Sequence, residues 1–221
     1  MTFSLLAQDP DTGALGGVAA TGSLCVGGWV LRGRLEAGMS ASQGAAPSTF
    51  WGEDVLDAMG SGLDAGTAVT RVTGADTGRD WRQLSALDAT GRAAAFTGAR
   101  NTPEMHSRTF AGGVAAGNML ASASVVDALA EAYLAASGSF EARLLAALRA
   151  ADAAGSDMRG LFSAALLVLR PDRAPLTLRI DYHETDPIGA LGALLDRATS
   201  GEYGAWFGQV PNPRDPMRIL D

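Results

Sequence analysis

The stretch from Thr2 to Ala20, TFSLLAQDPDTGALGGVAA, decides the fold. Its first part, Thr2 to Gln8, is a short run of apolar and β-branched residues that is typical of a strand. The turn signal DPDTG interrupts the run, and Ala14 to Ala20 then returns as a second strand. Chain ends usually fray unless tertiary contacts hold them, so a strand that starts at the second residue is expected to belong to the core.

Beyond this hairpin, strands and helices follow one another in blocks. We expect further strands near Leu24–Leu31, Leu35–Ser42, Trp81–Leu87, Arg92–Thr97, Arg108–Ala116, Phe162–Leu169 and Pro175–His183. Helices are expected near Trp51–Leu63 and over Pro187–Ala198, and three more are expected to begin after the N-caps Asp64, Ser124 and Ser139. Paired helices between blocks of strands do not fit simple βαβ winding. They indicate an α+β fold, a four-layer αββα sandwich of two stacked antiparallel sheets whose first strand lies centrally.

The domain organisation follows from the same pattern. Residues 1–198 are expected to form one αββα domain, because no linker rich enough to divide them is present. Residues 199–221 contain three prolines and are expected to form an irregular tail on that domain.

The amino-acid composition excludes several classes of function. The chain has 221 residues, a formal net charge of −7 and 17 basic residues, all of them Arg, so it offers no general nucleic-acid surface and no lysine chemistry. No apolar run approaches the roughly 18 residues that span a bilayer, so no membrane association is expected. The single cysteine, Cys25, suits a reducing cytoplasm. No motif for a cofactor or a metal stands out, and neither is expected.

Several stretches together resemble a known family. They are TFSLLAQDPDTGALGGVAA, ASQGAAP, RQLSALDATGRAAAFTGAR, GNMLAS, RLLAAL with AADAAGSDMRG, SAALLVLR and LRIDYH, and they cover Thr2 to about Leu194. The chain is similar in these stretches to a bacterial family known as domain of unknown function 1028, which is assigned to the N-terminal nucleophile (Ntn) hydrolases, the superfamily of the proteasome β-subunits. The resemblance implies the same αββα fold.

The resemblance also implies a nucleophile. In this superfamily the side chain of the mature first residue attacks, and the α-amine of that residue is the base. An α-amine has an unperturbed pKa of about 7.7–8.0, so a useful fraction is unprotonated at neutral pH. Removal of Met1 would make Thr2 this residue. The alternative for Thr2 is a β-branched residue at the start of a strand, without a chemical role.

Supporting residues follow from the same resemblance. The turn at Gln43 and Gly44 is where related enzymes place a backbone N–H for the oxyanion, although an ordinary strand-to-helix turn is the alternative. Asn118, expected to open the second helix pair, could donate to the same oxyanion or bind substrate. Assembly into a homo-oligomer through the helical layers is a further expectation.

Three more positions correspond to charged supporting groups of the superfamily. Asp157 matches an acid that orients the threonine and its amine, and Arg159 could pair with it. Thr21 stands where relatives have another acid. Relatives carry a lysine on the third strand, where this chain has only Arg32 and Arg34 nearby.

The implied function is an N-terminal-Thr amidohydrolase that cleaves a small amide or peptide bond in a small-molecule or peptide substrate. Because the lysine is missing, and because the chain departs from the family at Ser156, Phe162 and Tyr182, the alternative is a catalytically inactive protein of the same fold that binds a ligand or assists assembly.

A strand face near the end of the chain offers a second set of polar groups. Arg179, Asp181 and His183 alternate on it, and with Ser163 they suggest a triad, but a solvated strand face explains them more simply. Asp181 and His183, with two neighbouring acids, also suggest a metal cluster, although their spacing fits no known site.

Overall fold

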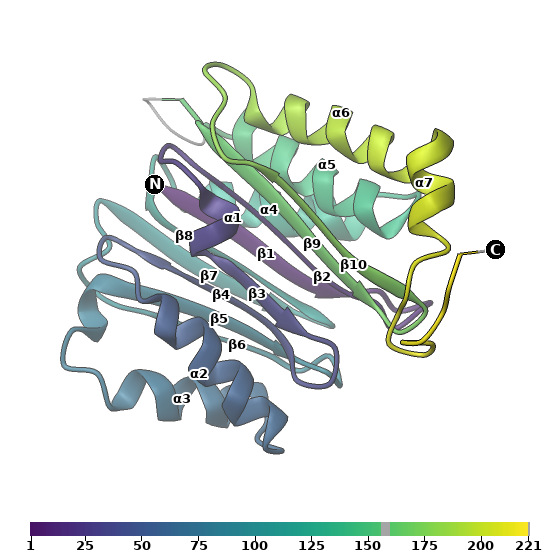
Figure 1. Cartoon of the computed structure of the whole chain (residues 1–221). Helices are drawn as coiled ribbons and strands as arrows, with labels where there is room; N and C mark the ends of the chain where they lie inside the picture. The colour runs from purple at the N-terminus through teal and green to yellow at the C-terminus, as the bar shows by residue number, and fades with distance from the viewer. Residues whose placement is uncertain (156–159, 221) are drawn as a thin grey trace.

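The computed structural model describes residues 1–155 and 160–220, and in this part the chain forms two antiparallel sheets that stack face to face (Figure 1). The six-stranded sheet has the order β10-β9-β2-β1-β8-β7 and consists of β1 (Thr2–Gln8), β2 (Leu15–Thr21), β7 (Glu104–Phe110), β8 (Gly113–Leu120), β9 (Ser163–Arg170) and β10 (Arg173–Ile180). The four-stranded sheet has the order β3-β4-β5-β6 and consists of β3 (Leu31–Arg34), β4 (Gly38–Gly44), β5 (Arg82–Asp88) and β6 (Ala93–Thr97).

Helices cover the outer faces of both sheets. The four-stranded sheet is covered by α2 (Thr49–Gly60) and α3 (Ala65–Gly74), and the six-stranded sheet by α4 (Ser124–Ala135), α5 (Phe140–Ala153) and α6 (Pro187–Thr199). Three short helices complete the described chain: α1 (Val26–Trp29), the 3-10 turn η1 (Arg79–Trp81) and α7 (Gly201–Phe207). The predicted αββα sandwich is therefore confirmed, and β1 lies centrally, between β2 and β8.

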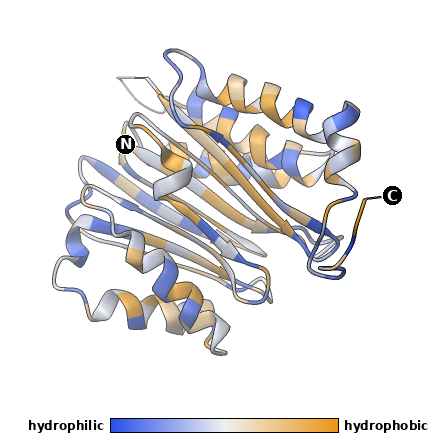
Figure 2. Ribbon diagram, viewed as in Figure 1, coloured by the Kyte–Doolittle hydropathy of each residue, from blue (hydrophilic) through white to orange (hydrophobic). Residues whose placement is uncertain are grey.

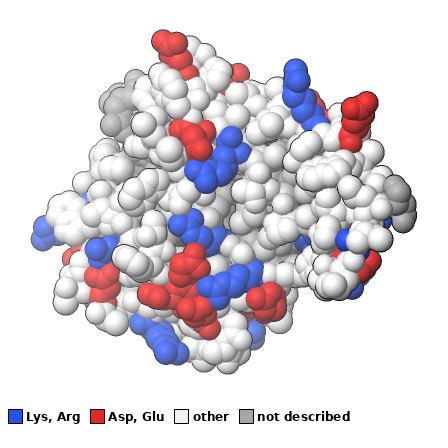
Figure 3. Space-filling view, in the orientation of Figure 1, with Lys and Arg blue, Asp and Glu red and all other residues white. Residues whose placement is uncertain are grey.

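Three apolar clusters hold the four layers together (Figure 2). The largest lies between the six-stranded sheet and α4, α5 and α6. The second fills part of the space between the sheets, and the third lies under α2 and α3. On the face shown in Figure 3, acidic and basic side chains lie interspersed over the α2–α3 layer, where Arg34 pairs with Glu53 and Asp57.

Several local predictions needed correction. The strand expected at Leu24–Leu31 is the short helix α1, because its glycines, Gly27 and Gly28, pack α1 directly against the Arg179 side chain. Ser124 does not cap α4, whose N-cap is Ala123 without a side-chain hydrogen bond. By contrast, Asp64 and Ser139 cap α3 and α5 as predicted, each accepting a hydrogen bond from a backbone N–H of the first turn.

The tail and Asn118 also differ from expectation. Part of the tail expected to be irregular from residue 199 is helical, since α7 occupies Gly201–Phe207. Asn118 does not open a helix pair: it lies inside β8. Among the described residues, no helix is long and apolar enough to span a membrane.

The side chains of β1 alternate between two environments, as the pleat requires. Phe3 and Leu5 pack toward α4 and α5, whereas Leu6 packs between the two sheets. Thr2 has the same parity as Leu6, so it faces the space between the sheets.

Gly16 in β2 is a point of close packing between sheet and helix. A methyl group at this position would lie 2.6 Å from the Phe140 ring and 2.8 Å from Leu144, both on α5. The sheet can approach α5 this closely only because Gly16 has no side chain.

We therefore expect Gly16→Ala to lower the free energy of unfolding by about 1–3 kcal/mol through overpacking. Gly74→Ala is the matched control, because nothing lies within 4 Å of a methyl group there and the residue ends α3; it should leave stability unchanged or raise it by up to about 1 kcal/mol. Urea unfolding followed by circular dichroism measures both. Equal stability of the two variants would contradict the packing argument.

Candidate active site

The first residue of β1 is held from both sides. Thr2 is paired in register with Thr21 of β2 and with Asn118 of β8, and 9% of its surface is exposed. Directly opposite residues of an antiparallel pair point to the same face, so all three side chains face the space between the sheets. The hydroxyl oxygens of Thr2 and Thr21 lie 3.0 Å apart, within hydrogen-bond distance.

Met1 lies on top of this pair. It is 2% exposed, and its carbonyl oxygen accepts a hydrogen bond of 2.5 Å from the Thr21 hydroxyl. The Thr21 hydroxyl has one proton, which it donates to Met1, so it accepts the hydrogen bond from Thr2. Met1 thus determines the direction of hydrogen bonding at Thr2.

A cavity of about 450 Å³ opens beside Thr2. The side chains of its described lining residues are apolar or uncharged: Met1, Thr2, Thr21, Ser23, Leu24, Val26, Trp29, Val30, Gln43, Gly44, Ala45, Pro47 and Met119. Leu24 and Trp29 are more than half exposed at its rim, at 56% and 51%. Among the described residues, the site therefore offers hydroxyl, amide and backbone groups inside an apolar wall.

Backbone strain is concentrated at this cavity. The described chain has two residues other than glycine with positive φ, Cys25 at 59° and Met119 at 52°. Met119 lines the cavity, and Cys25 lies between two residues that line it, Leu24 and Val26. Left-handed backbone in such residues costs on the order of 1 kcal/mol and clusters at functional sites.

A buried amide network lies behind Thr2. Gln83 of β5 accepts hydrogen bonds from Gln43 Nε2 at 2.7 Å and from Asn118 Nδ2 at 3.2 Å, and its own Nε2 donates to Thr97 and to the carbonyls of His106 and Gly117. Gln43 Nε2 also lies 3.5 Å from the carbonyl oxygen of Thr2. These side chains come from both sheets, so the network fixes the distance between the sheets at the Thr2 end.

Gln83 and Asn101 were not predicted as site residues from the sequence. Asn101 is fully buried; its Oδ1 accepts from the Ala45 N–H, and its carbonyl accepts from the Met119 N–H. It thereby connects the two backbone segments that border the cavity. The one available signal was a polar residue on the inward face of a buried strand, which is where Gln83 stands in RQLSALD.

The other expected site residues lie in different surroundings. Gln43 and Gly44 end β4 rather than forming a turn. Asn118 is fully buried and donates to Gln83, so its side chain does not line the cavity. Asp157 and Arg159 lie outside the described residues.

The backbone N–H of Gly44 points to the β3 side of β4, and Gly44 lines the cavity. The Ser42 N–H bonds to the Val30 carbonyl, on the β3 side of β4. N–H groups alternate in direction along an antiparallel strand, so the Gly44 N–H points to the same side. There the chain has turned into α1 (Val26–Trp29), and no strand continues to accept it.

The described side chains suggested for a triad or a metal cluster do not come together in a reactive arrangement. Ser163 is buried and bonds to the Ser23 carbonyl and the Val26 N–H, whereas His183 Nδ1 accepts from Thr185 and Asp186 N–H groups. Asp181 pairs with Arg179, and Asp186 caps α6. Each of these side chains is therefore engaged in its own local hydrogen bond or ion pair.

The cationic side chains of β3 also face away from Thr2. Arg32 pairs with Glu53, and Arg34 pairs with Glu53 and Asp57, all on α2. These acids raise the pKa of Arg34 above its ordinary value. The charge of both arginines is thus compensated on the outer face of the four-stranded sheet.

Fold and site define an αββα sandwich with a small cavity at the start of its central strand. A family model described as "Family of unknown function (DUF1028)" matches residues 2–191. The chain belongs to this family. The crystal structure of protein SPO2555 from Silicibacter pomeroyi, also described as DUF1028, is similar at 61% sequence identity and a TM-score of 0.97, covering 100% of this chain and 96% of that one. No curated protein matches the chain.

The amide network gives a stability prediction. Gln83→Leu removes an acceptor of Gln43 and Asn118 and the donor to one buried and one partly buried carbonyl, and each buried polar group left without a partner costs about 1–3 kcal/mol. We expect a loss of about 3 kcal/mol or more in urea unfolding. Gln209→Leu, at an exposed position, should change stability by less than about 0.5 kcal/mol. A Gln83 variant as stable as this control would mean that the network does not hold the sheets together.

Proposed function

We propose that this chain is an N-terminal-threonine amidohydrolase of the Ntn superfamily, which cleaves a small amide or peptide bond once Met1 has been removed. The observation that carries the proposal is the position of the Thr2 hydroxyl: it lines a cavity between the sheets and is hydrogen-bonded to Thr21. The left-handed backbone at Cys25 and Met119, on the border of the same cavity, supports a functional site there.

Loss of Met1 changes the hydrogen bonding at Thr2. The Met1 carbonyl, which accepts from Thr21, disappears, and the Thr2 nitrogen becomes a free amine. The Thr21 hydroxyl can then donate to the Thr2 oxygen, which leaves the Thr2 proton for the amine of the same residue. The space that Met1 fills becomes part of the cavity.

The chemistry then proceeds in two steps. Thr2 Oγ1 attacks the amide carbonyl carbon while its proton passes to the α-amine; the C–N bond of the substrate breaks, and the proton leaves with the amine product. Water then attacks the resulting ester of Thr2 and releases a carboxylic acid and the free hydroxyl. The Gly44 N–H is positioned to stabilise the oxyanion of both steps, because Gly44 lines the cavity and its N–H points to the β3 side of β4.

Asn118 and Gln43 have positioning roles in this proposal. The Asn118 side chain belongs to the amide network, and Asn118 is paired with Thr2 across the strand. Gln43 approaches the Thr2 carbonyl from the opposite sheet. The roles of Asp157 and Arg159, a cytoplasmic location and a homo-oligomer remain predictions.

The lining of the cavity favours a substrate that is small, uncharged and apolar on the acyl side. A charged group on the acyl side would be desolvated against Val26, Trp29, Val30 and Met119, whose side chains offer no counter-charge.

A mass measurement tests the proposal. Intact protein should lack Met1, and a β-lactone, whose ring opens when a hydroxyl attacks its carbonyl, should add once, on the peptide that begins with Thr2. Thr2→Ala should abolish the adduct, whereas Thr2→Ser should keep it. Thr21→Val, which removes a hydroxyl but preserves the shape, should slow labelling about 10-fold or more.

Two outcomes would contradict the enzyme hypothesis. One is complete retention of Met1; the other is a mature Thr2 terminus that the lactone does not modify. Retention of Met1 would favour the second candidate, a ligand-binding protein of the same fold, since Met1 is itself buried and hydrogen-bonded in this structure.

A further inference from the structure

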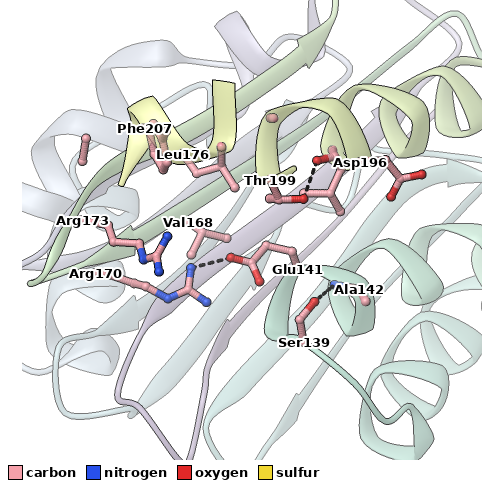
Figure 4. A pocket seen from close by; sticks show the side chains of 14 residues that line it. Ser139, Glu141, Ala142, Val168, Arg170, Arg173, Leu176, Asp196, Thr199 and Phe207 are labelled. Atoms are coloured by element: carbon pink, nitrogen blue, oxygen red, sulfur yellow. Dashed lines mark hydrogen bonds and ion pairs between the residues drawn. The ribbon is translucent and has the colours of Figure 1, made fainter. Parts of the chain in front are cut away.

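A second cavity lies on the other side of the six-stranded sheet. It has a volume of about 420 Å³ and lies between the first turn of α5, the β9–β10 hairpin and helices α6 and α7 (Figure 4). Ser163 pairs with Thr21, near the Thr2 cavity, whereas Arg170 at the far end of β9 lines this one. The eight residues of β9 therefore separate the two cavities by about 23 Å, and the sheet itself lies between them.

Two arginines from the hairpin face this cavity. Arg170 and Arg173 are directly opposite each other in the register of β9 and β10, and Figure 4 shows both guanidinium groups on the same side. Like charges directly opposite across a strand pair destabilise the sheet unless a counter-charge is present. The pair therefore requires compensation.

Among the described residues, only one of these two arginines forms an ion pair. Glu141, buried in the first turn of α5, forms an ion pair with Arg170. Arg173 has no ion pair among the described residues, and the other acid that lines the cavity, Asp196, pairs with neither arginine. The Arg173 guanidinium thus has no ion-pair partner among the described residues, and it lies exposed at the edge of the cavity.

Apolar side chains form part of the remaining wall, beside the polar residues Ser139, Asp196 and Thr199. Val168 and Leu176 are buried at the base of the cavity, Leu195 faces them from α6, and the partly buried Phe207 closes the α7 side. A cavity of a few hundred cubic ångströms with apolar walls and a few convergent polar groups is the common form of a small-molecule site.

We propose that this cavity binds a monocarboxylate with an apolar body, such as a medium-chain fatty acid. The carboxylate lies between Arg173 and the free donors of Arg170, and the hydrocarbon lies against Val168, Leu176 and Phe207. A carboxylate can pair with the Arg173 guanidinium, which has no ion pair among the described residues, whereas phosphate has no apolar body to contact Leu176 and Phe207. The site is independent of Thr2 and of the proposed hydrolase activity.

Calorimetric titration of the whole protein tests this proposal with octanoate, butanoate, 1-octanol and inorganic phosphate. Octanoate should bind most tightly, and at least 10-fold more tightly than butanoate, because each buried methylene contributes about 0.8 kcal/mol. Octanol and phosphate should each bind at least 10-fold more weakly than octanoate. Phosphate binding as tight as that of octanoate would show a simple anion site and overturn the proposal, as would equal binding of octanol.

Variants locate the binding. Arg173→Gln should weaken octanoate binding about 10-fold, and since Arg173 is exposed and unpaired, the fold should survive the change. Arg197→Gln removes the same charge from an exposed position of α6 that does not line the cavity, and it should change the affinity less than twofold. Equal effects of the two variants would mean general electrostatic attraction and would overturn the site. Thr2→Ala should leave octanoate binding unchanged, so this result stands whether or not the chain is a hydrolase.

Discussion

The structure depends on the way β1 is held. Its two neighbours pair with it along nearly its whole length, and both of its faces are covered, one by α4 and α5 and the other by the second sheet. A strand fixed on both edges and both faces cannot fray. Its first residue, Thr2, is therefore placed as firmly as a residue in the middle of a core strand. A reactive group near a chain end would lack this fixed position if its strand were not held in this way.

The space between the sheets changes character along the strands. At one end it is filled by Leu6, Leu15, Leu31, Met39 and Leu87, and at the other by the amides that meet at Gln83. Apolar packing holds the sheets together without direction, whereas hydrogen-bonded amides fix a distance and an orientation. The cavity opens at the polar end of the space between the sheets. The hydrogen-bonded amides therefore lie at the end where the positions of the groups around Thr2 must be defined.

The sequence was sufficient to predict those features that depend on residues close together in the chain. The caps at Asp64 and Ser139 were predicted correctly, because a cap depends on neighbouring residues alone. The errors have tertiary causes. Residues 26–29 turn into a helix where glycines meet Arg179, and Asn118 lies in a strand because β1 and β7 pair with β8 on both sides.

The sequence by itself determined the alternating blocks of strands and helices, the αββα class, the family and the choice of Thr2 as a candidate nucleophile, since these follow from periodicity and from stretches that can be compared directly. Only the tertiary structure decided what surrounds Thr2: Thr21 at hydrogen-bond distance, Met1 buried above it, and Gln83 and Asn101 behind it. It alone also revealed the Arg170–Arg173 cavity. The physical reason is that these groups are far apart in the chain, and their meeting depends on strand register and on the stacking of two sheets, which no local pattern records.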